Sequence, residues 1–217
     1  MLAQYLLVGL VAYLVGAIPV GLCVGWLVAG KDIRKEGSGK TGATNVARAV
    51  GWRAALAVFS LDVLKGTAAV LIGRALLGDS GADALALADV LTALAAVIGH
   101  NWPIYVGFRG GRGVAPGVGT VLAIVPLAFL CAIVLAAVLL ITTDTASAAS
   151  LIGTAFVVLV LASLLLTGQI SQWYWIYTVT GATLIFGGHW DNIGRLLRGT
   201  ERRLGVREKL LTRLRGG

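Results

Sequence analysis

Residues 37–48 read GSGKTGATNVAR and stand between two long apolar segments of the chain. Glycine allows the backbone to turn sharply and to bring its N–H groups close to a ligand. Consecutive N–H groups, with a helix N-terminus behind them, form a concave site for an anion. The side chains that can bond phosphate oxygens in this stretch are Ser38, Thr41, Thr44, Asn45 and Arg48. The stretch therefore favours an anion site, and a flexible linker between two helices is the alternative.

The composition around this stretch indicates an integral membrane protein. The chain has 217 residues, of which 58% are hydrophobic and 13% are charged, whereas soluble domains carry about 25% charged residues. Apolar runs longer than about 18 residues recur along it. Cys23 and Cys131 lie inside apolar segments, so neither a disulfide framework nor a metal site is expected. The net charge of +8 comes from residues flanking the apolar segments, which favours contact with anionic lipid head groups over nucleic acid.

Hydropathy and charge together predict seven membrane spans. The regions 31–53 and 109–112 and the tail after His189 hold 16 of the 18 Lys and Arg residues, so the positive-inside rule places all three in the cytoplasm. A first loop inside puts the N-terminus outside, and a cytoplasmic C-terminus then requires an odd number of spans. Dividing the long apolar run 114–143 at Pro126 gives seven, with short helices near the site. The expected spans are 2–29, 54–77, 84–98, 114–125, 127–141, 150–167 and 173–186.

These observations predict an all-α membrane protein with residues 1–217 forming a single domain. Its cytoplasmic face would carry three motif blocks, 31–53, 99–115 and 188–203. Asp62 and Lys65 fall inside the second span, three residues apart on one helical face. Charges at that depth are costly and are expected to face the protein interior. A structural ion pair and a catalytic role are both open for them.

The second and third blocks repeat the association of glycine with polar and basic side chains. In the second block His100 is followed by Gly110, Gly111, Arg112 and Gly113. A histidine at a membrane boundary can also be a hydrogen-bonded packing residue.

In the third block His189 and Asn192 share a face if the segment is helical, beside an apolar stripe among arginines. That pattern suits a helix lying on the cytoplasmic membrane surface, and a simple topology anchor is the alternative.

Taken together, the three blocks resemble the three motifs of the bacterial membrane acyl-phosphate:glycerol-3-phosphate acyltransferases, the PlsY family. The matching pieces are GSGKTGATNVARAVG (37–51) with DVLKG (62–66), GHNWPIYVGFRGGRGVA (99–115) and HWDNIGRLLRGTE (189–201). The resemblance implies transfer of a fatty acyl group from acyl phosphate to the 1-hydroxyl of glycerol 3-phosphate. The products would be lysophosphatidic acid and phosphate, made without acyl-CoA, acyl carrier protein, metal or other cofactor.

The resemblance also assigns residues to roles. It implies phosphate and acyl phosphate binding by Ser38, Gly39, Gly42, Asn45 and Arg48. It implies glycerol 3-phosphate binding by His100, Gly110, Gly111 and Gly113. It implies a part in activity and integrity for His189, Asn192 and Glu201. We take the catalytic candidates to be Ser38, Arg48, His100, Arg112, His189 and Asn192, and we add Gly37, Lys40 and Thr44 to the substrate-binding set.

This chain departs from the family pattern at several positions. Lys40 stands where the family usually has Asn, Arg112 where it usually has Lys, and Pro116 where Thr is common. Thr143 and Asp144 replace a stretch that often carries Arg and Tyr. Replacing Lys with Arg keeps the charge but not the shape of the group.

The expected chemistry needs little covalent catalysis because acyl phosphate is a mixed anhydride with a good leaving group. A cage of Arg48, Arg112, Lys40 and glycine N–H groups would offset the repulsion between two phosphates and stabilise the developing oxyanion. His189, His100 or a substrate phosphate oxygen could take the hydroxyl proton. The H-x-x-x-x-D signature of acyl-CoA-type acyltransferases is missing, since Tyr105 and Gly194 stand five residues after the two histidines.

A transporter of phosphorylated metabolites and a lipid-binding paralogue are the rival functions. A transporter would want polar groups through the bilayer rather than three motifs on one side. We expect a monomeric, multi-pass protein of the bacterial inner membrane, with its active site facing the cytoplasm. Its partners would be acyl phosphate, glycerol 3-phosphate and membrane lipids.

Overall fold

The computed structural model describes residues 2–78, 81–206, 208 and 212, which form helices joined by turns and loops, with no β-strand among them. The helices of the bundle are α1 (Leu2–Ala17), α2 (Val20–Ala29), α4 (Trp52–Leu77), α5 (Ala82–Asn101), α6 (Val114–Ile124), α7 (Pro126–Thr143), α8 (Ala146–Leu166) and α9 (Tyr174–Gly188). The shorter helices are η1 (Ile33–Lys35), α3 (Ala43–Ala49), η2 (Ile104–Val106) and α10 (Trp190–Leu197).

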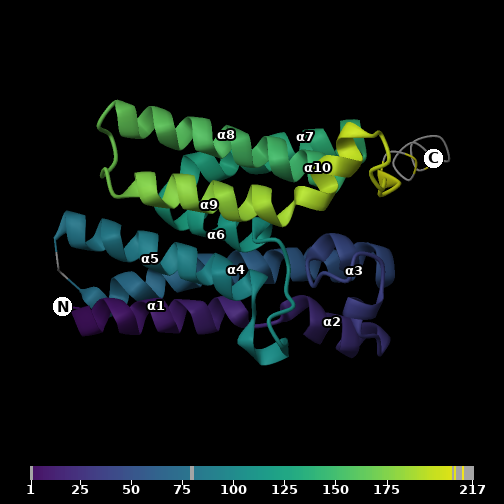
Figure 1. Cartoon of the computed structure of the whole chain (residues 1–217), viewed down its shortest axis with the longest axis horizontal. Helices are drawn as coiled ribbons and strands as arrows, with labels where there is room; N and C mark the ends of the chain where they lie inside the picture. The colour runs from purple at the N-terminus through teal and green to yellow at the C-terminus, as the bar shows by residue number, and fades with distance from the viewer. Residues whose placement is uncertain (1, 79–80, 207, 209–211, 213–217) are drawn as a thin grey trace.

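The bundle has the character of a multi-pass membrane protein. Five helical stretches within the described residues are long and apolar enough to cross a bilayer. Helices α6 and α9 coincide with the other two expected spans, but they have only 11 and 15 residues. In Figure 1 the long helices lie along one axis, with the N-terminus at one end and α2, α3 and α10 at the other. The all-helical fold is confirmed, whereas a full crossing by α6 and α9 stays a prediction.

The first expected span is broken at Pro19, where a single helix over residues 2–29 was predicted. Helix α1 ends at Ala17 and α2 begins at Val20, because proline lacks the N–H that an uninterrupted helix needs. The break leaves the carbonyl of Ile18 available to a side chain. Lys65 Nζ donates to that oxygen over 2.9 Å. The lysine of the second span therefore fixes the break in the first.

The two charges expected inside the second span form an ion pair on α4. Lys65 Nζ lies 2.8 Å from Asp62 Oδ1, and both side chains are buried. His100, at the end of α5, places its Nδ1 3.5 Å from the same carboxylate oxygen. Pairing lowers the cost of charge at this depth. The group therefore ties together α4, α5 and the break after α1.

The predicted division of the long apolar run at Pro126 is confirmed. Helix α6 ends at Ile124, and α7 starts with Pro126 in its first turn, where the missing N–H costs nothing.

Two glycines let α6 pack closely against α4. A Cβ atom on Gly66 would overlap the carbonyl of Pro116, and one on Gly119 would overlap the carbonyl of Val63. Small residues at such crossings let helix backbones approach each other in membranes.

The largest core cluster lies toward the end of the bundle opposite the motif blocks. It includes Val70, Val90, Val121 and Leu161, contributed by α4, α5, α6 and α8.

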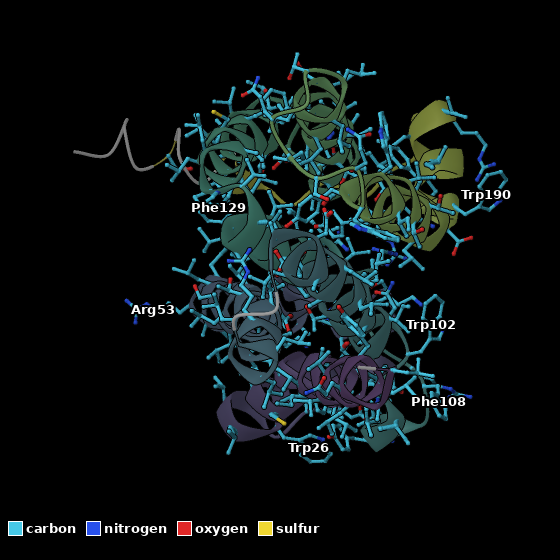
Figure 2. All side chains as sticks on the ribbon, turned by 90° about the vertical axis from the view of Figure 1, so that its left-hand side faces the viewer. Trp26, Arg53, Trp102, Phe108, Phe129 and Trp190 are labelled. Carbon is cyan, nitrogen blue, oxygen red and sulfur yellow. The ribbon has the colours of Figure 1, made fainter. Side chains whose placement is uncertain are left out.

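Large aromatic side chains face outward instead. Figure 2 shows Trp26, Trp102 and Trp190 pointing away from the helices, and each is 47–77% exposed. Such outward apolar surface suits contact with lipid.

Candidate functional site

The three polar blocks of the sequence meet at one end of the bundle. Thr41 in the first block donates its N–H to the carbonyl of Gly110 in the second, over 3.4 Å. Arg48 Nη2, also in the first block, donates to the carbonyl of Arg202 in the C-terminal tail, over 3.3 Å. Segments about 70 and 150 residues apart in sequence therefore form one surface. The convergence of the motifs is what a shared site requires.

The first block is built around the side chain of Asn45, which is 2% exposed. Its Nδ2 donates to the carbonyls of Ile33, Glu36 and Lys40 over 2.8–3.1 Å, and its Oδ1 accepts from the N–H of Ser38 over 2.9 Å. The sequence suggested Asn45 as a donor to phosphate. In the structure its amide is engaged by the loop itself, so Asn45 shapes the loop that presents its neighbours.

Glycine is required at two positions of this loop. Gly37 and Gly39 have φ angles of +53° and +69°, which side-chain-bearing residues rarely adopt. Gly42 ends the loop as the residue before α3, and Thr44 on α3 faces an apolar pocket described below. The Lys40 side chain is exposed.

The second block folds back on the end of α5. Gly110 donates its N–H to the carbonyl of Asn101, and Gly111 donates to the carbonyl of His100, over 3.2 and 3.0 Å. A Cβ on Gly111 would overlap Nε2 of the His100 ring, and Gly113 has a φ of +79°. Glycine is therefore needed here so that the loop can lie against the imidazole. His100 is 6% exposed, with Asp62 on its other nitrogen.

His189 stands where α9 ends and α10 begins. Its Nδ1 lies 2.8 Å from the carbonyl of Ile185, and since a carbonyl can only accept, this nitrogen carries the proton. Burial lowers the pKa of His189 to about 4, and the nearby positive charge of Arg112 adds to the effect. The ring is therefore neutral at pH 7, with the lone pair of Nε2 free.

One carboxylate organises α10. Glu201 accepts from Asn192 Nδ2 through Oε1 and from Arg195 Nε through Oε2, both over 2.8 Å. Burial acts to raise the pKa of Glu201, but the side chains of Asn192, Arg195 and Ser147 and the charge of Arg195 outweigh it and lower the pKa. The sequence suggested Glu201 as a substrate-binding residue. A carboxylate does not attract phosphate, and here it orients the amide and the guanidinium beside it.

Arginines gather around this carboxylate. Burial has the largest effect on Arg112 and lowers its pKa. Repulsion from Arg195 and, more weakly, from Arg48 lowers this pKa further, whereas attraction by Glu201 raises it. Burial likewise lowers the pKa of Arg48, and Arg195 repels it as well. We call Arg48, Arg112 and Arg195 the arginine cluster. Of the predicted cage, Arg48 and Arg112 are brought together, and Arg195 lies with them, while Lys40 is exposed.

Several buried polar atoms at this end have no hydrogen-bond partner among the described residues. They are Arg112 Nε, Asn192 Oδ1 and Asn101 Oδ1. Buried polar atoms in native proteins are paired with few exceptions, and an exception calls for an explanation. A polar ligand that bonds Arg112 and Asn192 would supply one.

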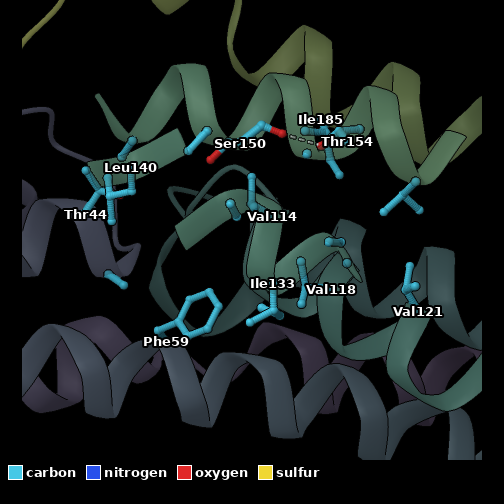
Figure 3. A pocket seen from close by; sticks show the side chains of 18 of the residues that line it. Thr44, Phe59, Val114, Val118, Val121, Ile133, Leu140, Ser150, Thr154 and Ile185 are labelled. Atoms are coloured by element: carbon cyan, nitrogen blue, oxygen red, sulfur yellow. Dashed lines mark hydrogen bonds between the residues drawn. The ribbon is translucent and has the colours of Figure 1, made fainter. Parts of the chain in front are cut away.

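An apolar pocket of about 440 Å³ opens beside the arginine cluster. Figure 3 shows its two ends, with Thr44 and Leu140 at one and Val121 at the other. Along α8 its lining extends from Ala146 to Leu161, which is about 22 Å at 1.5 Å per residue. Alanine and glycine make up much of the walls, and no charged side chain lines it among the described residues. A ligand that fits both surfaces would be an amphiphile, with an anionic head at the arginine cluster and an apolar chain in the pocket.

Sequence reasoning missed two members of this site. Arg195 lies three residues after Asn192, on the same face of a helix, so helical spacing could have found it. Ser147 lies in the first turn of α8, and nothing in its surroundings distinguishes it in the sequence from the other hydroxyl residues of that span.

Comparison with known proteins shows the family to which this chain belongs. Residues 6–199 match the family model described as glycerol-3-phosphate acyltransferase. The chain is 40% identical over 204 residues to a glycerol-3-phosphate acyltransferase of Thermoanaerobacter sp. (strain X514), covering 94% of this chain and 98% of that protein. It is 44% identical over 213 residues to glycerol-3-phosphate acyltransferase 3 of Dehalococcoides mccartyi (strain CBDB1), covering 94% and 97% of the two chains.

Two solved structures share the fold. Both are crystal structures of PlsY (YgiH), an integral membrane glycerol 3-phosphate acyltransferase. The glycerol 3-phosphate form superposes with a TM-score of 0.83 at 34% identity, covering 95% of this chain and 98% of that one. The lysophosphatidic acid form gives a TM-score of 0.77 at 33% identity, with 92% and 94% covered.

The pocket makes a prediction about the length of its ligand. Gly153 lines it about 10 Å along α8 from Ala146, and a Cβ there would meet nothing within 4 Å. We expect Gly153→Leu to fold normally and to weaken binding of hexadecyl phosphate by at least about ten-fold, since each excluded methylene loses about 0.8 kcal/mol. Hexyl phosphate, too short to pass Gly153, should bind as before. Calorimetric titration in detergent measures both, with Leu159→Ala on the 70% exposed face of α8 as control. An equal loss for both ligands would contradict the assignment.

Proposed function

We propose that this chain, which belongs to the glycerol-3-phosphate acyltransferase family, transfers a fatty acyl group from acyl phosphate to the 1-hydroxyl of glycerol 3-phosphate. The observation that carries the proposal is the arginine cluster next to a long apolar pocket, whose lining includes Ala47, beside Arg48, and Val114, two residues after Arg112. The product would be lysophosphatidic acid, an early intermediate of phospholipid synthesis. The related crystal structures, which are the glycerol 3-phosphate and lysophosphatidic acid forms of PlsY, agree with a substrate and a product of this kind.

The arrangement of polar and apolar surface suggests where each substrate lies. The acyl chain occupies the pocket, and its phosphate lies at the mouth, near Thr44 and the arginine cluster. The phosphate of glycerol 3-phosphate lies against the second block, where Arg112 Nε is buried without a partner. Each phosphate offsets the repulsion among the arginines. The arginines in turn hold the two substrate phosphates close together, although two free anions at that separation would repel each other. Holding the hydroxyl near the acyl carbon then supplies much of the rate.

The proposed reaction balances without a covalent enzyme intermediate. The 1-hydroxyl oxygen of glycerol 3-phosphate forms a bond to the acyl carbonyl carbon. The bond from that carbon to the phosphate oxygen then breaks, and inorganic phosphate leaves with the electron pair. The arginines stabilise the charge that develops on the carbonyl oxygen and the leaving group.

The environment of His189 indicates where the hydroxyl proton goes. With a pKa of about 4, the free nitrogen of His189 is a weak base. A phosphate monoester has a second pKa of about 6 and holds a proton more readily. We therefore infer that a substrate phosphate oxygen takes the proton. His189 then acts as a neutral hydrogen-bonding group that accepts through Nε2.

We further propose that the protein crosses the bacterial inner membrane seven times and works as a monomer, with the arginine cluster on the cytoplasmic side. In Figure 1 α3 and α10 lie at the end of the bundle opposite the N-terminus, in agreement with an odd number of crossings. The positive-inside rule assigns that end to the cytoplasm.

The orientation predicts which positions a membrane-impermeant thiol reagent can reach in intact cells. Single cysteines at Lys35, Arg109 and Arg198 should stay unlabelled, whereas cysteines at Asp83 and Gln169 should react, in a background lacking Cys23 and Cys131. All five positions are exposed, so access is limited by the membrane alone. Permeabilised cells, in which all five should label, are the control. Labelling at Arg198 from outside would reverse the topology.

The donor can be tested with purified protein. We expect phosphate release and lysophosphatidic acid from palmitoyl phosphate with glycerol 3-phosphate, and none from palmitoyl-CoA, since the H-x-x-x-x-D pair is absent. Phosphate assay and mass spectrometry measure the two products. Comparable turnover with palmitoyl-CoA would overturn the donor. Absence of any product would instead favour a transporter or a lipid-binding protein.

The arginine cluster can be tested by three substitutions. Loss of a charge-assisted hydrogen bond removes about 1.5–3 kcal/mol, so Arg48→Ala and Arg112→Ala should each lower kcat/KM by roughly one to two powers of ten. Arg112→Lys keeps the charge and should retain activity, with a changed KM for glycerol 3-phosphate. Arg53→Ala is the matched control, because Arg53 lies in the first turn of α4, five residues after Arg48, and points outward in Figure 2. Near-normal kcat/KM in both alanine variants, with unchanged thermal melts, would show that these arginines only anchor loops.

A further inference from the structure

Asp144, outside the three motif blocks, has an unusual backbone and an unusual set of partners. It ends α7 with a φ of +55°, a left-handed conformation that residues other than glycine seldom adopt. It is 8% exposed although it lies in a turn between two helices. Both carboxylate oxygens are bonded to backbone N–H groups of a segment some 60 residues further along the chain.

That segment is the C-terminal tail after α10, and we call residues 201–206 the tail segment. The N–H of Gly205 donates to Asp144 Oδ2 over 3.0 Å, and the N–H of Val206 donates to Oδ1 over 2.8 Å. The N–H of Leu204 donates to the main-chain carbonyl of Asp144 over 3.0 Å. Three consecutive N–H groups thus converge on one residue, and charge-assisted bonds of this kind are strong.

The other residues of the tail segment belong to the site. Glu201 holds Asn192 and Arg195, and the carbonyl of Arg202 accepts from Arg48. Leu204 forms part of the pocket wall at the end where Thr44 lies. The tail segment therefore touches both the arginine cluster and the mouth of the apolar pocket, and Asp144 fixes its far end.

We propose that Asp144 is a positioning residue that holds the tail segment across the mouth of the pocket, where it contributes to binding of the acyl phosphate donor. The proposal rests on the proposed function of the site. Without the carboxylate, Leu204 loses its place in the wall and Arg48 loses the carbonyl that aims its guanidinium. The donor, which spans the pocket and the cluster, depends on both.

If Asp144 only ended helix α7, its loss would leave donor binding unchanged. Two variants of Asp144 therefore separate this structural role from the role in positioning the tail segment. Asp144→Gly suits the left-handed backbone and removes both acceptors. Asp144→Asn tolerates the same backbone and keeps one carbonyl oxygen. Asp83→Ala, an exposed carboxylate at the opposite end of the bundle, is the control.

We expect Asp144→Gly to raise KM for palmitoyl phosphate by roughly five- to thirty-fold, the factor that corresponds to 1–2 kcal/mol. The KM for glycerol 3-phosphate and kcat should change less, the melting temperature should fall little, and Asp144→Asn should restore much of the donor KM. Asp83→Ala should behave as the unmodified protein. An unchanged donor KM in folded Asp144→Gly would overturn the proposal. If Asp144→Gly does not fold, Asp144→Asn and Leu204→Ala test the proposal instead. An unchanged KM for palmitoyl phosphate in both of these variants would overturn the proposal.

A second readout needs no turnover. Trypsin can cut after the exposed Arg202 and Arg203, and a held tail segment should resist it. Cleavage should be faster in Asp144→Gly, and the unreactive amphiphile dodecyl phosphate should protect the unmodified protein more than the variant. If palmitoyl phosphate supports no reaction, the proposed donor fails, whereas the protease result still decides the role of Asp144. Equal cleavage and equal protection in both proteins would overturn that role.

Discussion

The structure depends on bringing several guanidinium groups together at one end of an apolar bundle. Arg48, Arg112 and Arg195 repel one another, and their partial burial weakens the hydration that would otherwise compensate. Glu201 offsets part of this by binding Arg195, and Asp191 attracts Arg112, but burial and the repulsion from Arg195 and Arg48 still lower the pKa of Arg112. The site therefore carries unfavourable energy that an incoming anion relieves. On this view phosphate binding needs no closing lid, because the fold has already gathered the positive charge.

Keeping these arginines in place accounts for much of what the motifs contain. Asn45 uses its whole amide to shape the first loop, and Glu201 uses its carboxylate to hold α10. Gly111 lets the second loop lie against His100, whose ring in turn rests near Asp62 and the ion pair of α4. Several motif residues thus build the backbone around the arginines. This role depends on geometry and is not visible in residue type.

Hydropathy, charge and proline placement were enough to predict the helical bundle, the break at Pro126 and the convergence of the three blocks. They did not predict the break at Pro19, because the apolar run continues through it and the side chain that bonds the freed carbonyl, Lys65, lies on another helix. The pocket was also beyond sequence reasoning, since it depends on small residues from several helices leaving space together. Asp144 stood out only as a departure from the family pattern, because its partners lie about 60 residues away in the sequence.

The division of the bundle into a packed end and an open end follows from side-chain size. Larger residues such as Val90 and Leu161 fill the space near the end opposite the motifs, while alanines and glycines leave room toward the motif end. On the proposed reaction this places the bond to be broken at the boundary between apolar and charged surroundings. The leaving phosphate then departs on the aqueous side, and the product keeps its chain among apolar side chains. Release of phosphate restores the repulsion among the arginines, which prepares the site for the next pair of anions.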